Sequence, residues 1–230
     1  MPENTQSMPA VILTLACFIA IIISRKERTK EIEMEIISTI LTKKFIQRGI
    51  VEPAKKDIYK TGLELIIADI INILLILTLG FITKSFIYAC IYVIMFWTVR
   101  RFSGGFHAKT YAICRIVFIG TYISMICIST VIHRWLLVSG VCDLIAFTTM
   151  YLFAPVAHPN KELNTKEKKA NKLFAIITTL FCILISIILV FLGYKEGLII
   201  SLTLLAITIL MYVGMLTNAK GGKNNVKNSR

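Results

Sequence analysis

Long apolar runs separated by short polar segments dominate this chain. A helix needs about 20 mostly apolar residues to cross a membrane. Six runs reach or approach that length, namely 63–82, 86–99, 111–132, 135–157, 173–192 and 198–216. The run over 86–99 is short, and we expect flanking residues to complete its span. The pattern predicts an all-α fold class, that of a polytopic integral membrane protein with six core transmembrane helices.

Two segments before the first core run show other patterns. Residues 8–24 are uncharged but short, and they predict an extra N-terminal anchor helix. Residues 31–48 place apolar side chains on one helical face and mostly polar ones on the other. The apolar face comprises Ile36, Ile37, Ile40, Leu41 and Phe45. We expect this amphipathic, interfacial helix to lie on the inner leaflet, with a soluble connector helix as the alternative.

Three parts follow from these patterns. Residues 1–33 form an N-terminal extension, 34–218 form the membrane domain, and 219–230 form a basic cytoplasmic tail. Met34 offers an alternative start of translation. If translation begins there, the anchor over 8–24 is absent from the protein.

Composition excludes two large classes of protein. Hydrophobic residues make up 56% of the chain and charged residues 17%, and the mean hydropathy is +0.75. Soluble domains average about 45–50% apolar and about 25% charged residues. The chain is therefore too apolar for a water-soluble globule, and it lacks the low hydrophobicity that disorder requires.

The basic residues are distributed unevenly along the predicted helices. The chain has 26 Lys and Arg against 13 Asp and Glu. All of the basic residues except Lys84, Arg134 and Lys195 fall on one side of the six alternating spans. The positive-inside rule then predicts that the 100–115 loop and the tail are cytoplasmic. Because no nucleic-acid recognition motif accompanies the charge, we expect anionic lipid headgroups, and no nucleic acid, as its partners.

The candidate chemistry lies in the segment 100–115. Gly104-Gly105 permits a tight turn, and His107 precedes Cys114 by seven residues. A helix N-terminus near Cys114, with Lys109 and Arg115 close by, favours the nucleophilic thiolate. Seven helical residues rise about 10 Å, so a His107–Cys114 pair requires non-helical chain between the two. The alternative is a polar membrane loop with a buried thiol. The six cysteines and three histidines match no zinc spacing, and we expect no metal.

These residues resemble the accessory gene regulator B (AgrB) family of membrane cysteine endopeptidases, which process bacterial autoinducer propeptides. The motif falls at Arg100, Gly105, His107-Ala108 and Cys114, and the resemblance covers roughly 34–218. It implies that this segment is an AgrB-like peptidase domain in the bacterial cell membrane, with its catalytic loop on the cytoplasmic side. The implied substrate is a short AgrD-like propeptide, and the implied reaction needs no cofactor. The resemblance leaves open whether the protein forms a homodimer.

The resemblance also implies a mechanism. Cys114 would cut off the C-terminal tail through a thioester, with His107 as general base. The thioester would then cyclise to a thiolactone or lactone autoinducing peptide for quorum sensing. Arg100, Gly105 and Glu64 are the candidate substrate-binding or supporting residues.

Two other functions stay open on the residues alone. Glu64, Asp69 and Asp143 are acids within apolar runs, where acids are functional candidates or form hydrogen bonds between helices. Six spans with such acids would also suit a small multi-helix membrane transporter or peptide exporter. A membrane scaffold without catalysis is the third alternative, and it leaves the His107–Cys114 pair unexplained.

Overall fold

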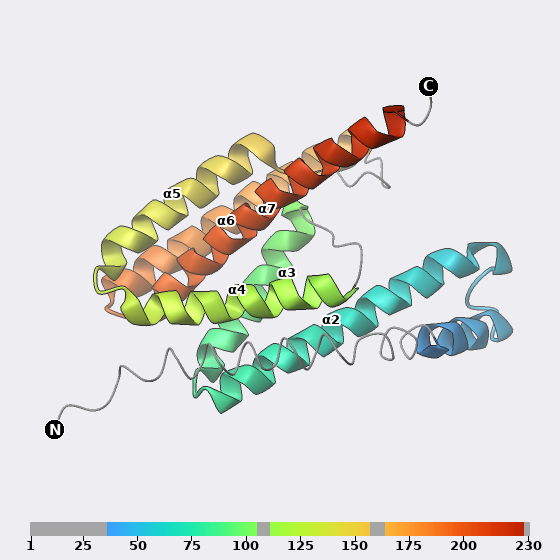
Figure 1. The fold of residues 1–230 in the computed structure, drawn as a ribbon, viewed down its shortest axis with the longest axis horizontal. Coiled ribbons are helices and arrows are strands. Elements are labelled where there is room, and N and C mark those ends of the chain that lie inside the picture. Colours follow the sequence, from blue (N-terminus) through green and yellow to red (C-terminus); the bar gives the residue numbers. More distant parts are fainter. Residues whose placement is uncertain (1–35, 105–110, 157–163, 228–230) are drawn as a thin grey trace. The chain divides into compact units, whose positions relative to one another are not determined.

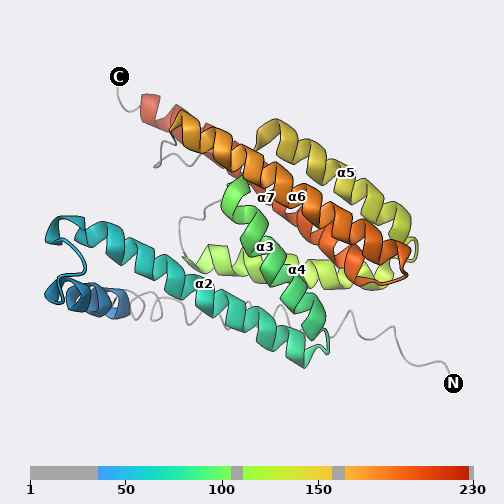
Figure 2. The same ribbon diagram turned by 180° about the vertical axis from the view of Figure 1, so that it is seen from behind.

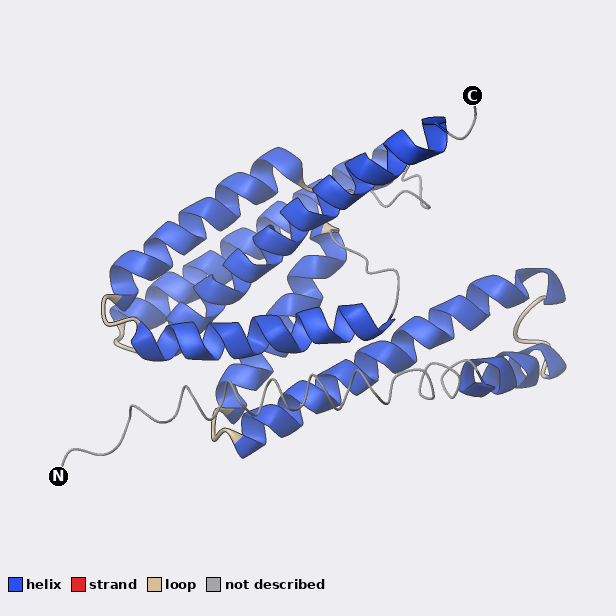
Figure 3. Cartoon of the chain, viewed as in Figure 1, coloured by secondary structure: helices blue, strands red, loops and turns tan. Residues whose placement is uncertain are grey.

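The computed structural model describes residues 36–104, 111–156 and 164–227, and these residues form helices joined by short turns (Figures 1 and 3). A first helix covers 36–47. The labelled elements that follow are η1 (Pro53–Lys55), α2 (Lys56–Ile82), α3 (Phe86–Ser103), α4 (Tyr111–Val131), α5 (Trp135–Phe153), α6 (Thr165–Phe191) and α7 (Glu196–Lys227). The predicted anchor over 8–24 lies outside the described residues.

Six of these helices are long and apolar enough to cross a membrane. They correspond one by one to the six predicted spans, so the prediction of an all-α polytopic membrane protein is confirmed. The short run over 86–99 is extended by Arg100, Arg101, Phe102 and Ser103 into an 18-residue helix. The flanking residues therefore complete the span, as expected from the shortness of the apolar run over 86–99.

Several helix ends differ from those predicted. α5 ends at Phe153 and not at 157, because Ala154 is extended and precedes Pro155, and a residue before proline disfavours the helical conformation. α6 begins at Thr165, eight residues before the apolar run. There the Glu167 side chain accepts a hydrogen bond from the Asn164 backbone N–H at 3.3 Å, which is half of a capping box.

The chain divides into two compact units, which we describe separately. Unit 1 comprises Met1–Thr83 and Lys109–Ile123, and unit 2 comprises Lys84–Ala108 and Ser124–Arg230. Unit 1 therefore contains the helix over 36–47, α2 and the first part of α4. Unit 2 contains α3, the remainder of α4, and α5 to α7.

Unit 2 is built around α7, which is the most buried of the six spans. Helices α5, α6 and α7 lie side by side, and α3 also packs against α6 and α7 (Figure 2). Gly197 allows the turn between α6 and α7 to close tightly. A Cβ atom there would lie 2.6 Å from both the Ser186 carbonyl oxygen and the Val190 Cγ2 atom.

In unit 1, the amphipathic helix over 36–47 buries polar side chains and exposes apolar ones. This is the reverse of an amphipathic helix on the surface of a soluble protein. Ser38 and Thr42 are fully buried, whereas Ile36, Ile37 and Ile40 are about half exposed. Small hydroxyl side chains allow two helices to approach closely, and the isoleucines are left on the outside. The helix is amphipathic, as predicted; its place on the inner leaflet stays a prediction.

Candidate active site

Cys114 lies in the first turn of α4, which begins at Tyr111. Its side chain is partly exposed, and its thiol is not part of a disulfide. The first four backbone N–H groups of a helix lack partners within the helix, so this end carries partial positive charge. The Cys114 thiol therefore lies at the positive end of the helix dipole.

The other half of the predicted dyad lies outside the described residues. His107 and Gly105 both fall within 105–110, for which the structure gives no placement. The non-helical connection that a His107–Cys114 pair requires therefore stays a prediction, as do the roles of both residues.

Arg115, the neighbour of Cys114, is buried between membrane helices. Its side chain is 3% exposed, and its Nε–H donates a hydrogen bond to Asn72 Oδ1 in α2 at 3.3 Å. A charged side chain is costly at membrane depth unless it finds acceptors. The Arg115–Asn72 hydrogen bond therefore connects the first turns of α4, which contain Cys114, to the middle of α2.

Asn72 is a residue that sequence reasoning missed. It is a buried polar side chain within a long apolar helix, and such residues commonly form hydrogen bonds between membrane helices. A polar residue within an apolar run was therefore the signal by which the sequence could have indicated Asn72. Its partner lies 43 residues further along the chain, and no pattern in the sequence pairs the two.

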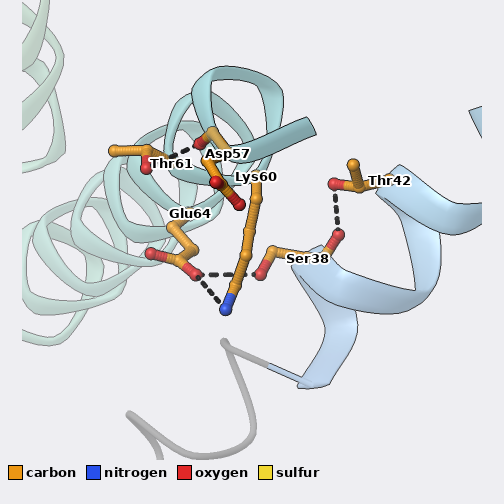
Figure 4. A network of polar contacts seen from close by, with 6 residues as sticks. All are labelled: Ser38, Thr42, Asp57, Lys60, Thr61 and Glu64. Carbon is orange, nitrogen blue, oxygen red and sulfur yellow. Dashed lines mark hydrogen bonds and ion pairs between the residues drawn. The ribbon is translucent and has the colours of Figure 1, made fainter. Parts of the chain in front are cut away.

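Glu64 belongs to a polar network at the start of α2 (Figure 4). Its Oε1 atom accepts a hydrogen bond from Ser38 Oγ at 3.1 Å and lies 3.9 Å from Lys60 Nζ. Thr42 Oγ1 in turn donates to the Ser38 carbonyl oxygen at 2.7 Å. These contacts connect the helix over 36–47 to α2, so the structure gives Glu64 a tethering role in unit 1.

Arg100 lies in the last turn of α3, in unit 2. Its guanidinium carbon is 5.0 Å from the centre of the Phe96 ring, a cation–π geometry. A cation at a helix C-terminus also interacts favourably with the helix dipole. Both contacts orient the side chain near the end of α3.

Gly104 ends α3 and is tied to the segment that follows α5. The Val156 N–H donates a hydrogen bond to the Ser103 carbonyl oxygen at 2.9 Å, and Gly104 and Val156 form an isolated parallel bridge. Gly104 has φ 70° and ψ −157°, a region that is essentially restricted to glycine. Gly104 thus has a backbone conformation that the predicted Gly104-Gly105 turn allows, and the turn itself stays a prediction because Gly105 lies outside the described residues.

We expect Gly104→Ala to destabilise the protein by about 1–3 kcal/mol, because of the strained backbone and because the new Cβ would collide with the Val156 carbonyl group. The thermal unfolding midpoint in detergent should fall by several degrees. Gly140→Ala in α5 is the matched control, since a Cβ there meets nothing within 4 Å. Equal midpoints for the two variants would contradict the constraint at Gly104.

Two further acids within predicted spans differ in their surroundings. Asp69 in α2 is exposed on the surface of its unit. Asp143 in α5 is 4% exposed and accepts a hydrogen bond from Ser186 Oγ at 3.1 Å. Asp143 therefore lies in the helix packing of unit 2.

Comparison with known proteins gives consistent matches over most of the chain. The model of the family described as accessory gene regulator B matches residues 34–212. AgrB-like protein 2 of Clostridium perfringens is 26% identical over 175 residues, covering 71% of this chain and 80% of that protein. Accessory gene regulator protein B of Staphylococcus haemolyticus is 24% identical over 162 residues, covering 66% and 80%.

The protein of the same name from Staphylococcus aureus is 23% identical over 130 residues, covering 56% of this chain and 69% of that protein. No solved structure matches the chain. The matched residues contain five of the six described helices that could span a membrane and most of the sixth, together with the 100–115 segment and the helix over 36–47.

Proposed function

The chain belongs to the accessory gene regulator B family, and from this premise we propose that it is a membrane-embedded cysteine endopeptidase. Its substrate is a short AgrD-like propeptide of the accessory gene regulator quorum-sensing system. The enzyme removes the C-terminal tail of this propeptide and leaves an acyl group that cyclises to the autoinducing peptide.

The observation that carries this proposal is the position of Cys114. It is a partly exposed thiol on the first turn of α4, at the positive end of the helix dipole. By contrast, Cys142 and Cys182 are buried within unit 2, where a thiol behaves as a small apolar group. Cys114 is also the cysteine that fits the spacing from His107 in the family's motif.

In the first step, His107 accepts the thiol proton and Cys114 Sγ attacks the carbonyl carbon of the bond before the tail. The C–N bond breaks, and His107 returns the proton to the leaving amine. The tail departs as a free peptide, while the remainder is held as a thioester on Cys114.

In the second step, the thiol or hydroxyl of a Cys or Ser within the held peptide attacks the thioester carbon. This closes a thiolactone or lactone ring and releases Cys114. Because no water enters the product, the cyclic peptide and the tail together have the mass of the precursor. Exclusion of water from a membrane-embedded site favours ring closure over hydrolysis.

We assign three supporting roles. Arg100, whose position is fixed by Phe96, binds carboxylates of the substrate or stabilises the developing oxyanion. Gly105 shapes the turn that follows Gly104. Glu64 acts indirectly, because it holds the helix over 36–47 against α2.

The chain is a multi-pass membrane protein. We propose that its 100–115 segment and its tail face the cytoplasm, where the propeptide is made, and that the basic residues there contact anionic lipid headgroups. The proposed chemistry uses no metal or organic cofactor, and a homodimer is compatible with it.

Co-expression with an AgrD-like propeptide, followed by mass spectrometry, tests the function. We expect a free C-terminal tail and a second product whose mass is that of the precursor minus the tail. A linear product heavier by one water molecule would indicate hydrolysis without cyclisation. An uncut precursor that accumulates outside the cell would favour the peptide exporter instead.

A further inference from the structure

Four oxygen atoms from three helices meet inside unit 2, away from Cys114. Ser186 Oγ in α6 lies 3.1 Å from Asp143 Oδ2 in α5, 3.0 Å from the Gly197 carbonyl oxygen and 2.7 Å from Ser201 Oγ in α7. Ser201 Oγ is also 3.2 Å from the Gly197 carbonyl oxygen. All four residues are buried. We call them the oxygen cluster.

The oxygen cluster has fewer hydroxyl protons than it has oxygen–oxygen contacts at hydrogen-bonding distance. Each serine hydroxyl can donate one proton, so two protons serve the four oxygen–oxygen contacts just given. An ionised Asp143 adds acceptors and no proton. Two of the contacts therefore bring lone pairs together without a hydrogen between them, and a positive charge among the oxygens would relieve this repulsion.

The negative charge of an ionised Asp143 side chain is also not balanced by its described surroundings. Asp143 Oδ1 is buried and has no hydrogen-bond partner among the described residues. No Lys, Arg or His side chain in the described part of the chain forms an ion pair with Asp143. Buried charges are ordinarily paired or coordinate a metal, and acids within membrane helices mark ion sites or proton relays.

We propose that the oxygen cluster is a sodium-binding site, with Asp143, Ser186, Ser201 and the Gly197 carbonyl oxygen as its ligands. One carboxylate balances the charge of one monovalent cation. A calcium ion takes six to eight oxygen ligands and usually several carboxylates, which this cluster does not offer. Carboxylate, hydroxyl and backbone carbonyl oxygens are typical ligands of hard cations in proteins.

The location of the cluster indicates what the cation does. Asp143 is eight residues into α5, about 12 Å from the start of that helix. Ser186 lies near the end of α6, and Gly197 and Ser201 lie in the first turns of α7. A bound sodium ion would join these three helices and stabilise unit 2. This role is separate from peptide cleavage.

Thermal unfolding of the full-length protein in detergent tests the site, with sodium ion alone as the probe. A thiol-reactive dye reports unfolding, because Cys142 and Cys182 are buried close to the cluster. Replacing about 150 mM choline chloride by sodium chloride holds the ionic strength constant. We expect sodium to raise the midpoint by about 3 °C or more, since a ligand that binds the folded state stabilises it.

Asp143→Asn should remove the response to sodium and keep a similar shape at the site. Ser201→Ala, which deletes one neutral ligand, should weaken the response, and it serves as the second variant if Asp143→Asn does not fold. Asp69→Asn in α2 is the matched control and should respond like the wild type. Equal wild-type midpoints in sodium and choline, or an undiminished sodium shift in Asp143→Asn, would overturn the proposal.

Discussion

Cys114→Ala should abolish release of the propeptide tail, a fall of at least about 10³-fold, because it removes the thiol that we propose as the nucleophile. Tail release and the covalent intermediate are both measured by mass spectrometry after co-expression with the propeptide. Cys114→Ser should be nearly as inactive, since a histidine base does not generate an alkoxide as readily as a thiolate. Expression and membrane insertion should match the wild type, because Cys114 is only partly buried.

The other described cysteines provide the controls. Single alanine substitutions at Cys90, Cys127, Cys142 and Cys182 should retain cleavage, with modest losses of stability at the two buried positions. Full activity of Cys114→Ala would remove the peptidase proposal. Loss of activity in all five variants would point to a general folding defect and not to a nucleophile.

His107→Ala should lower turnover by about 10²–10⁴-fold, the usual contribution of a general acid–base group. It should also slow the alkylation of Cys114 by iodoacetamide at neutral pH, because an imidazolium beside a thiol favours the reactive thiolate. Alkylation is best measured in a background in which the other five cysteines are alanine, so that Cys114 alone reacts.

His133→Ala is the matched control for this substitution. His133 lies in the turn between α4 and α5, at the other end of α4 from Cys114. Its removal should change neither turnover nor alkylation. If His107→Ala also left both unchanged, His107 would be an ordinary loop histidine and the dyad would be wrong.

The six spans could be predicted because a bilayer requires a minimum apolar length, and length is visible in a sequence. The end of α5 was missed although Pro155 marks it, since the apolar run continues past the proline. The start of α6 was missed because its first two turns are charged. Asn164 and Glu167 carry a local capping pattern that would have located it.

The contacts around the candidate site could be predicted only in part. Gly104 was expected in a turn because glycine tolerates positive φ. Its partner Val156 is far away in sequence, and the pairing depends on how α3 and α5 each pack against α6 and α7 in unit 2. Arg115 was expected to act on Cys114 as a nearby cation. The structure adds that its Nε–H donates to Asn72 Oδ1, because a buried guanidinium needs an acceptor in its surroundings.

The inverted helix over 36–47 changes which substitutions that segment tolerates. Its buried positions are Ser38, which contacts Glu64 of α2, and Thr42, so we expect large side chains to be excluded there whatever their polarity. Its outward positions, Ile36, Ile37 and Ile40, are about half exposed, so apolar residues of different shapes are tolerated there. A mutational profile of this segment would therefore be ordered by side-chain volume on one face and by hydrophobicity on the other.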